Sequence, residues 1–519
     1  MDPEFLALPL RTLADAALSR ARSLGATHAD FRVHRLLTQR LRLRDGAVQS
    51  ATESASVGLA VRVVVDGTWG FASHAELTAA VATATVERAV QVARAVQVAR
   101  ALRALNADPV VLADEPVHGS LDAPAAWVSD YELDPFTVPT ADKVGLLGEY
   151  SRRLLASDGV DHVAASCLQV KEQTFYADLA GTATAQQRVR LHPEIEATTV
   201  DKVAGAFETM RTLAPPVGRG WEYLGTQSTW DWDDELAQLP ELLAEKVKAP
   251  SVVAGPTDLV IDPTNLWLTI HESIGHATEY DRAIGYEAAY AGTSFATPEQ
   301  LGTLRYGTDV MHVSADRTVE HGLASIGYDD DGVAAQSWDL VRDGVLVRYQ
   351  LDRVFAPRLG VERSNGCSYA DSPHHVPIQW MANVSLRPDP VGERTTADLI
   401  AAVTDGIYVV GDKSWSIDMQ RYNFQFTGQR FYRIRNGELA GQVRDVAYQA
   451  TTTDFWGSME AVGGSSTWRL GGAFNCGKAQ PGQVAAVSHG CPSALFRDIN
   501  VLNTRSEGGA EAPAQEAAA

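Results

Sequence analysis

Cysteine is scarce in this sequence, with four residues in a chain of 519. Cys167, Cys367, Cys476 and Cys491 lie far apart, and the first residues show no apolar core long enough for export. These features argue against a disulfide framework and predict a reduced, cytoplasmic environment. We expect Cys167 and Cys367 to be small, buried apolar side chains.

The sequence also has no long apolar run and has fewer basic than acidic residues. The sequence has no stretch of about 20 uninterrupted apolar residues, so we expect no transmembrane helix. It has 44 lysines and arginines against 65 aspartates and glutamates, a formal net charge of −21. Because nucleic acids and anionic membranes attract positive potential, the sequence predicts neither as a partner. Peptides and small molecules remain the expected ligands.

Three common catalytic motifs are missing. The sequence has no glycine-rich phosphate loop, no G-x-S-x-G nucleophile elbow and no dinucleotide fingerprint. Serine hydrolase and nucleotide-binding functions therefore lose their main support.

The hydrophobic patterns predict an α+β fold in several domains, because 519 residues exceed what one compact core holds. The N-terminal part alternates apolar and polar residues around Asp-Gly turns, which predicts an antiparallel meander with flanking helices. The C-terminal part is rich in short strands and carries the predicted metal-site helix. The expected division is an N-terminal α+β domain at 6–106, a central α+β segment at 125–250, a strand-rich C-terminal domain at 251–505 and a disordered tail at 506–519.

Residues 271–276 read HESIGH, which differs from the zinc-peptidase pattern H-E-x-x-H by one extra residue between the histidines. Two imidazoles offer a metal two neutral nitrogen ligands, and Glu272 is placed to deprotonate a metal-bound water. On a regular α-helix His271 and His276 would lie about 140° apart around the axis, because five residues advance about 500°. A π-helical turn brings such residues onto one face, so we predict a helix that is locally widened near Gly275.

A catalytic zinc ion usually has a third protein ligand and one open position for water. The residues that offer a third ligand are His374, His375, Cys367, Cys476, His489 and Cys491. His374 and His375 are neighbours before an expected strand, so at most one approaches the metal. His489 and Cys491 share a strand face, but together they would complete four ligands and exclude water. Cys476 alone leaves an open position, and its neighbouring glycines suit a tight loop.

Several separated stretches follow the order of one known family. They are RLRDGAVQSATESASVGLAVRVVVDGTWGFAS at 42–73, HESIGHATEYD at 271–281, HGLASIGYDDDG at 321–332, VRDGVLVRYQLDR at 341–353 and GAFNCGKAQPGQ at 472–483. This chain resembles the TldD side of the TldD/PmbA family, once called modulators of DNA gyrase. The likeness spans most of the chain.

The resemblance implies a zinc metallopeptidase of the HExxxH type. Its Zn2+ ligands would be His271, His276 and Cys476, with Glu272 as the general base. The resemblance also implies a dimer, formed with a TldE/PmbA-like homologous subunit that lacks the motif or with a second copy. An internal cavity would admit short or unfolded peptide substrates, and some members of the family mature ribosomally made peptide precursors.

Two acidic stretches have competing interpretations. Glu279 and Asp281 match acidic positions of the family, where they either support a ligating imidazole or form a solvated helix face. Asp329–Asp331 in YDDDG lack the ligand spacing of a calcium loop, so we expect a turn.

A second function class stays open at this stage. The chain could be a non-catalytic peptide-binding or assembly subunit with a structural zinc, and a fourth ligand from His489 or Cys491 would indicate this. Zinc-dependent hydrolysis of a non-peptide amide is a third alternative.

Overall fold

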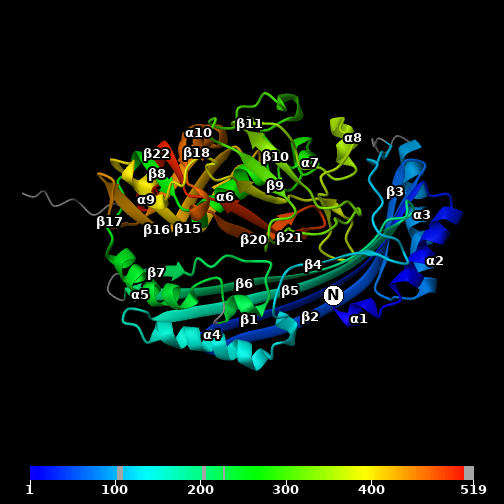
Figure 1. Ribbon diagram of the computed structural model, residues 1–519, viewed down its shortest axis with the longest axis horizontal. Coiled ribbons are helices and arrows are strands. Elements are labelled where there is room, and N and C mark those ends of the chain that lie inside the picture. The colour runs from blue at the N-terminus through cyan, green and yellow to red at the C-terminus, as the bar shows by residue number, and fades with distance from the viewer. Residues whose placement is uncertain (102–108, 202–205, 226–227, 508–519) are drawn as a thin grey trace, which may run out of the picture.

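The computed structural model describes residues 1–101, 109–201, 206–225 and 228–507. Two layers make up the molecule (Figure 1): a long curved sheet with helices on its outer face, and a C-terminal module that packs against the inner face. The predicted α+β fold class is confirmed. The tail predicted to be disordered lies, from residue 508 on, outside the described residues.

The N-terminal part is the predicted meander with flanking helices. Its elements are α1 (Pro3–Leu6), α2 (Leu10–Ser23), β1 (His28–Arg44), β2 (Ala47–Val65), β3 (Thr68–His74) and α3 (Ala79–Ala101). Both hairpins turn at the Asp-Gly pairs, and the φ angles of Asp45 and Gly46 are 52° and 77°. Positive φ at both central residues is what a type I′ turn requires, so the turn prediction is confirmed.

The central part continues the same sheet. Its elements are β4 (Ala125–Val128), α4 (Thr140–Leu155), β5 (His162–Asp178), β6 (Ala183–Asp201), β7 (Ala206–Arg211) and α5 (Trp232–Lys248). β5 pairs antiparallel with β1, giving the strand order β3-β2-β1-β5-β6-β4, with β7 on β6. One core packs α2 and α3 against one end of this sheet, and a second core packs α4 and α5 against the other. The strands of the first two predicted domains therefore share one sheet.

The C-terminal module is rich in strands, as predicted. Its elements are β8 (Gly255–Ile261), α6 (Pro263–Ile270), α7 (Tyr280–Ala283), β9 (Val313–Asp316), β10 (Ser337–Arg342), β11 (Val345–Leu346), α8 (Phe355–Leu359), β12 (Ser368–Tyr369), β13 (Ile378–Gln379), β14 (Asn383–Leu386), α9 (Thr396–Ala401), β15 (Asp405–Ile417), β16 (Asn423–Arg435), β17 (Glu438–Val443), β18 (Val446–Thr451), α10 (Thr452–Gly457), β19 (Met459–Val462), β20 (Arg469–Lys478), β21 (Gln483–Cys491), β22 (Ala494–Asn503) and α11 (Thr504–Glu507). A seven-stranded sheet, ordered β15-β8-β22-β18-β16-β17 with β19 on β22, supports α6. The β20–β21 hairpin lies between α6 and the long sheet (Figure 1).

Buried ion pairs join the two layers. Arg32 on β1 contacts Asp330 at 2.5 Å, and Arg62 on β2 contacts Asp331 at 2.5 Å. Both aspartates belong to the YDDDG segment, which forms the predicted turn and closes at Gly332 with φ 76°. Because charges taken out of water need partners, these pairs fix how the module sits on the sheet.

All four cysteines are free and buried, as expected for Cys167 and Cys367. Among the helices that the structure describes, none combines the length and the hydrophobicity that a membrane crossing requires.

Candidate metal centre

The helix that carries His271 and His276 becomes wider at His271. α6 is capped by the side chain of Asp262 and starts regularly. Residues 271–275 then form one π-helical turn, in which the amide of His276 donates to the carbonyl of His271 at 3.0 Å. The widening predicted from the five-residue spacing is confirmed.

Neighbouring side chains pack closely against Gly275 in this turn. A Cβ atom at this position would lie 3.1 Å from Met381 Sδ and 3.5 Å from His489 Cε1. The carbonyl of Gly275 accepts a hydrogen bond from Gln350 Nε2 at 2.8 Å. The missing side chain thus lets neighbouring segments approach the widened turn.

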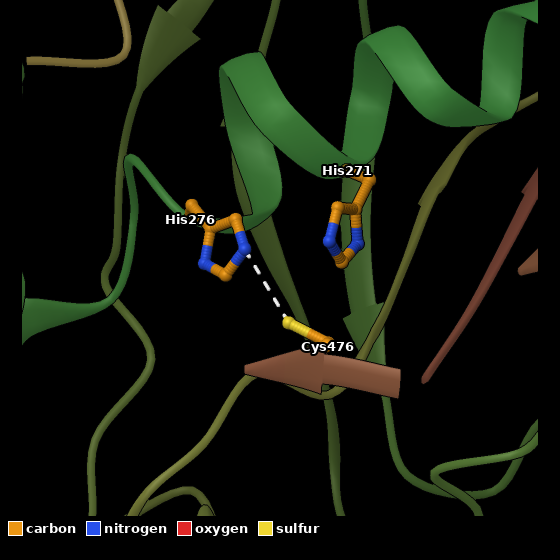
Figure 2. Close-up of side chains that lie close together, drawn as sticks. All are labelled: His271, His276 and Cys476. Carbon is orange, nitrogen blue, oxygen red and sulfur yellow. Dashed lines mark hydrogen bonds between the residues drawn. The ribbon is translucent and has the colours of Figure 1, made fainter. Parts of the chain in front are cut away.

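Three side chains that can bind a metal meet beside this turn. Figure 2 shows the imidazoles of His271 and His276 pointing from the helix toward Cys476 on β20. Cys476 Sγ lies 3.4 Å from His276 Nε2, and the ligand atoms of all three residues lie within 4.8 Å of one another. A tetrahedral zinc ion, with bonds of about 2.0 Å to nitrogen and 2.3 Å to sulfur, places these atoms about 3.5 Å apart. The structure therefore brings the three predicted ligands together.

The two imidazoles are in the protonation state that binds zinc, whereas the thiol must first lose its proton. Burial lowers the pKa of His271 to about 3 and holds that of His276 well below its usual value, so both imidazoles are neutral near pH 7. Burial, reinforced by two nearby glutamates, raises the pKa of the Cys476 thiol well above its usual range. A cation is needed to displace this proton, as expected for a site of two nitrogens and one sulfur.

A buried network of charges orients His276. Glu279 Oε2 lies 2.9 Å from His276 Nδ1 and accepts from Arg282 Nε at 3.1 Å. Lys478 Nζ donates to Glu279 Oε1 at 3.1 Å and to Asp281 Oδ1 at 2.8 Å. Although burial opposes it, Lys478 and His276 hold the pKa of Glu279 well below its usual value. Glu279 therefore fixes the Nδ1 proton and leaves Nε2 free for a metal. Asp281 supports Glu279 indirectly, because it accepts from Lys478 Nζ and from the amide of Arg282.

His489 orients the other histidine through a chain of two hydrogen bonds. His489 Nδ1 lies 2.9 Å from the carbonyl oxygen of Val384, and His489 Nε2 lies 2.7 Å from His271 Nδ1. A carbonyl only accepts, so His489 carries its proton on Nδ1 and accepts the His271 proton on Nε2. This arrangement leaves Nε2 as the free nitrogen of His271.

The alternative ligand pair is therefore not part of the group. Both nitrogens of His489 have partners, and Cys491 Sγ lies 3.6 Å from the carbonyl oxygen of Pro263. His374 and His375 lie elsewhere and contact Ser73 and Asp371.

Replacing His489 with alanine is expected to weaken zinc binding by about 10- to 100-fold, the usual cost of losing a group that orients a ligating imidazole. Competition with a chelator of known affinity measures this effect. The matched control is His375→Ala, which removes a histidine hydrogen-bonded to Asp371. Equal zinc affinities for the two variants would contradict the orienting role.

Glu272 stands beside the three ligands and is almost fully buried. Its Oε2 accepts a hydrogen bond from Arg421 Nη1 at 2.7 Å. Burial raises the pKa of Glu272, and Arg421 opposes this rise. A carboxylate whose pKa moves toward neutrality is suited to accept a proton and return it.

A cavity of about 360 Å³ opens onto this group between the two layers. Its walls include, from the sheet and the following loop, His192, Glu194, Arg211 and Trp230, and from the C-terminal module Trp267, His271, Glu272, His276, Asp412, Trp415, Arg421, Phe474 and Cys476. Its volume lies in the range of cavities that bind small ligands. The predicted ligands and base therefore face a space that a substrate segment can enter.

Lys478, Arg282 and Arg421 of the site were not predicted from the sequence. Lys478 stands two residues after Cys476, and i and i+2 on a strand share a face, so the spacing held the necessary information. Arg421 lies 149 residues from Glu272, and no local pattern connects them.

Comparisons with known proteins identify the family of this chain. The family model described as "PmbA/TldA metallopeptidase C-terminal domain" matches residues 254–503, and "PmbA/TldA metallopeptidase domain 1" matches residues 29–96. A protein of Methanothermobacter thermautotrophicus named "Metalloprotease" is 26% identical over 485 residues, covering 92% of this chain and 96% of the relative.

The chain is also similar to a protein named as a zinc metalloprotease and to a solved structure. The "Zinc metalloprotease TldD homolog" of Saccharolobus solfataricus is 24% identical over 286 residues, covering 54% of this chain and 60% of that protein. The crystal structure of TldE from Thermococcus kodakarensis superposes with a TM-score of 0.69 at 13% identity, covering 94% of this chain and 99% of that one. At this identity the second similarity shows a shared fold.

Proposed function

Because this chain belongs to the TldD/PmbA family of metallopeptidases, we propose that it is a zinc-dependent peptidase of the HExxxH type that hydrolyses short or unfolded peptides. The observation that carries this proposal is the meeting of His271, His276 and Cys476 beside Glu272 on a cavity wall. Maturation of a peptide precursor is one reaction of this type.

Each residue of the group has a role in this reaction. His271, His276 and Cys476 would hold the zinc ion, which when bound acts as a Lewis acid that lowers the pKa of water and polarises a peptide carbonyl. Glu272 accepts a proton from the attacking water and returns it to the leaving amine.

The alternative of a non-catalytic subunit with a structural zinc has less support. A structural site generally has four protein ligands, whereas His489 and Cys491 make other contacts. A structural zinc site also requires no general base, which is the role that Glu272 can fill.

The test is cleavage of unfolded peptides by the purified chain, followed by mass spectrometry. We expect cleavage that a chelator abolishes and added zinc restores. A zinc-loaded protein that cleaves no peptide, alone or with a homologous subunit, would contradict the proposal.

We also propose that the protein is cytoplasmic and works as a dimer, with a TldE/PmbA-like subunit or with a second copy. The fold shared with TldE supports the first form. β3 pairs with β2 only from Leu59 to Val65, and residues 51–56 of β2 are exposed. Such a sheet edge needs a cover, which a partner subunit would provide.

We therefore expect the active species to have the mass of a dimer. Light scattering coupled to size-exclusion chromatography, with cleavage measured across the peak, checks this expectation. Full activity in a monomeric fraction would contradict it.

A further inference from the structure

Peptide hydrolysis places negative charge on the carbonyl oxygen of the substrate, and a peptidase needs a fixed donor for this charge. We propose that Arg421 donates a hydrogen bond to that oxyanion and is a catalytic residue. The inference rests on the peptidase function proposed above and adds a protein donor to the polarisation of the carbonyl that a bound zinc ion would supply.

Arg421 lies in the right place for this role. It lines the same cavity as the three ligands and Glu272, and its Nη1 donates to Glu272 Oε2 at 2.7 Å. Nη2 donates to the carbonyl oxygen of Ala291 at 3.1 Å. A guanidinium has five N–H donors, so these two bonds leave donors for a ligand. The side chain keeps 14% of its surface exposed.

The backbone holds Arg421 in place before any substrate arrives. It stands in the turn between β15 and β16, where the carboxylate of Asp418 accepts three backbone amides, those of Gln420, Tyr422 and Asn423, at 2.8 to 3.1 Å. The φ of Arg421 is 62°, in the left-handed region.

The same turn is also tied to a neighbouring segment. The amides of Thr293 and Phe295 donate to the carbonyls of Met419 and Gln420 at 2.7 and 2.9 Å. A donor fixed in this way needs little reorganisation during the reaction, which is the condition for strong electrostatic stabilisation.

The other basic side chains near the cavity are less suitable. Lys413 lines the cavity but is exposed to solvent. Arg211 pairs with Asp412, and Arg282 is fully buried against Glu279. Arg469 stands seven residues before Cys476 on β20, roughly 23 Å away at about 3.3 Å per residue. Among the described residues that line the cavity, Arg421 is therefore the basic group in contact with Glu272.

The proposed step balances as follows. The water oxygen bonds to the carbonyl carbon, Glu272 takes the water proton, and the π electron pair moves onto the carbonyl oxygen beside Arg421. When the carbon–nitrogen bond breaks, the oxygen electron pair re-forms the carbonyl and the amine takes the proton from Glu272. Arg421 keeps its own protons, because a guanidinium stays charged at neutral pH.

The test compares Arg421→Ala, Arg421→Gln and Arg421→Lys in the full chain with zinc content measured for each. We expect Arg421→Ala to lower kcat by about 100- to 1,000-fold, the usual loss for one oxyanion donor, with KM changed by less than about 3-fold. Arg421→Gln should resemble Arg421→Ala, and Arg421→Lys should recover part of the loss. The control is Arg435→Ala, which removes a surface arginine of β16 paired with Asp405 and should leave kcat unchanged.

A second measurement separates this role from mere positioning of Glu272. In a Glu272→Gln background, affinity for a phosphinic peptide, a tetrahedral anion, should still fall by at least about 100-fold on Arg421→Ala. Affinity for an uncleaved substrate peptide should stay the same. If Arg421→Ala leaves the affinity for the phosphinic peptide unchanged, or keeps a wild-type kcat, the proposed role of Arg421 is wrong. The proposed peptidase function is not affected by either result. A wild-type chain that cleaves no peptide would overturn the proposed function, and phosphinic affinity would still decide the role of Arg421.

Discussion

Replacing Cys476 with alanine is expected to remove most of the zinc and to abolish peptide cleavage. Cys476 is one of the three proposed protein ligands, and its Sγ lies 3.4 Å from the Nε2 of His276. Without it, two imidazoles remain, which bind zinc too weakly to retain it through purification. Zinc content by elemental analysis, together with a cleavage assay, gives the result directly.

The chain offers a matched control for this change. Cys491 is also fully buried and lies on the strand paired with β20, but its sulfur contacts the carbonyl oxygen of Pro263. Cys491→Ala should therefore keep its zinc and its activity. The reverse pattern, with zinc lost from Cys491→Ala and kept by Cys476→Ala, would show that the ligand assignment is wrong.

Replacing Glu272 with alanine should leave zinc bound and lower turnover by at least about 100-fold, the usual contribution of a general base. The carboxylate lies beside the proposed ligands and on the cavity wall, and in the described part of the chain it accepts its hydrogen bond from Arg421. Turnover measured under single-turnover conditions separates this chemical effect from product release.

Glu272→Gln is the closer variant, because it keeps the size of the side chain and can still bond to Arg421. It should be as slow as Glu272→Ala, since an amide cannot accept and return the proton. Wild-type turnover in either zinc-loaded variant would exclude Glu272 as the base.

The local features of the fold could be predicted because their causes are local. The hairpin at Asp45 and Gly46 follows from residues that tolerate positive φ. The π-helical turn follows from the spacing of His271 and His276, because two ligands on one helix must share a face.

The joining of the first two predicted domains into one sheet could not be predicted in the same way. β1 pairs with β5 across a large separation in the chain, and no local pattern records such a pairing. Arg32 and Arg62 also stand at strand positions that a hydrophobic pattern assigns to solvent. They are buried because Asp330 and Asp331 of the other layer cover them.

For the site, too, the sequence indicates which side chains can bind a metal but not which atoms they contact in the fold. His271 and His276 were predicted from their side chains and their spacing. Cys476 was predicted as the third ligand because the family resemblance implies it and because it leaves one position open for water. The sequence treated His489 as a rival ligand, because residue type indicates that a histidine can bind a metal but not which atoms it meets in the fold. In the structure His489 meets His271 and a carbonyl, and so acts on the ligand.

The most direct measurement is a crystal structure of the purified chain with anomalous diffraction data collected on both sides of the zinc absorption edge. We expect one zinc peak bonded to His271 Nε2, His276 Nε2 and Cys476 Sγ, with its remaining position turned toward the cavity and Glu272. A zinc ion bonded to His489 or Cys491, or the absence of zinc from this group in an active preparation, would contradict the proposed metal centre.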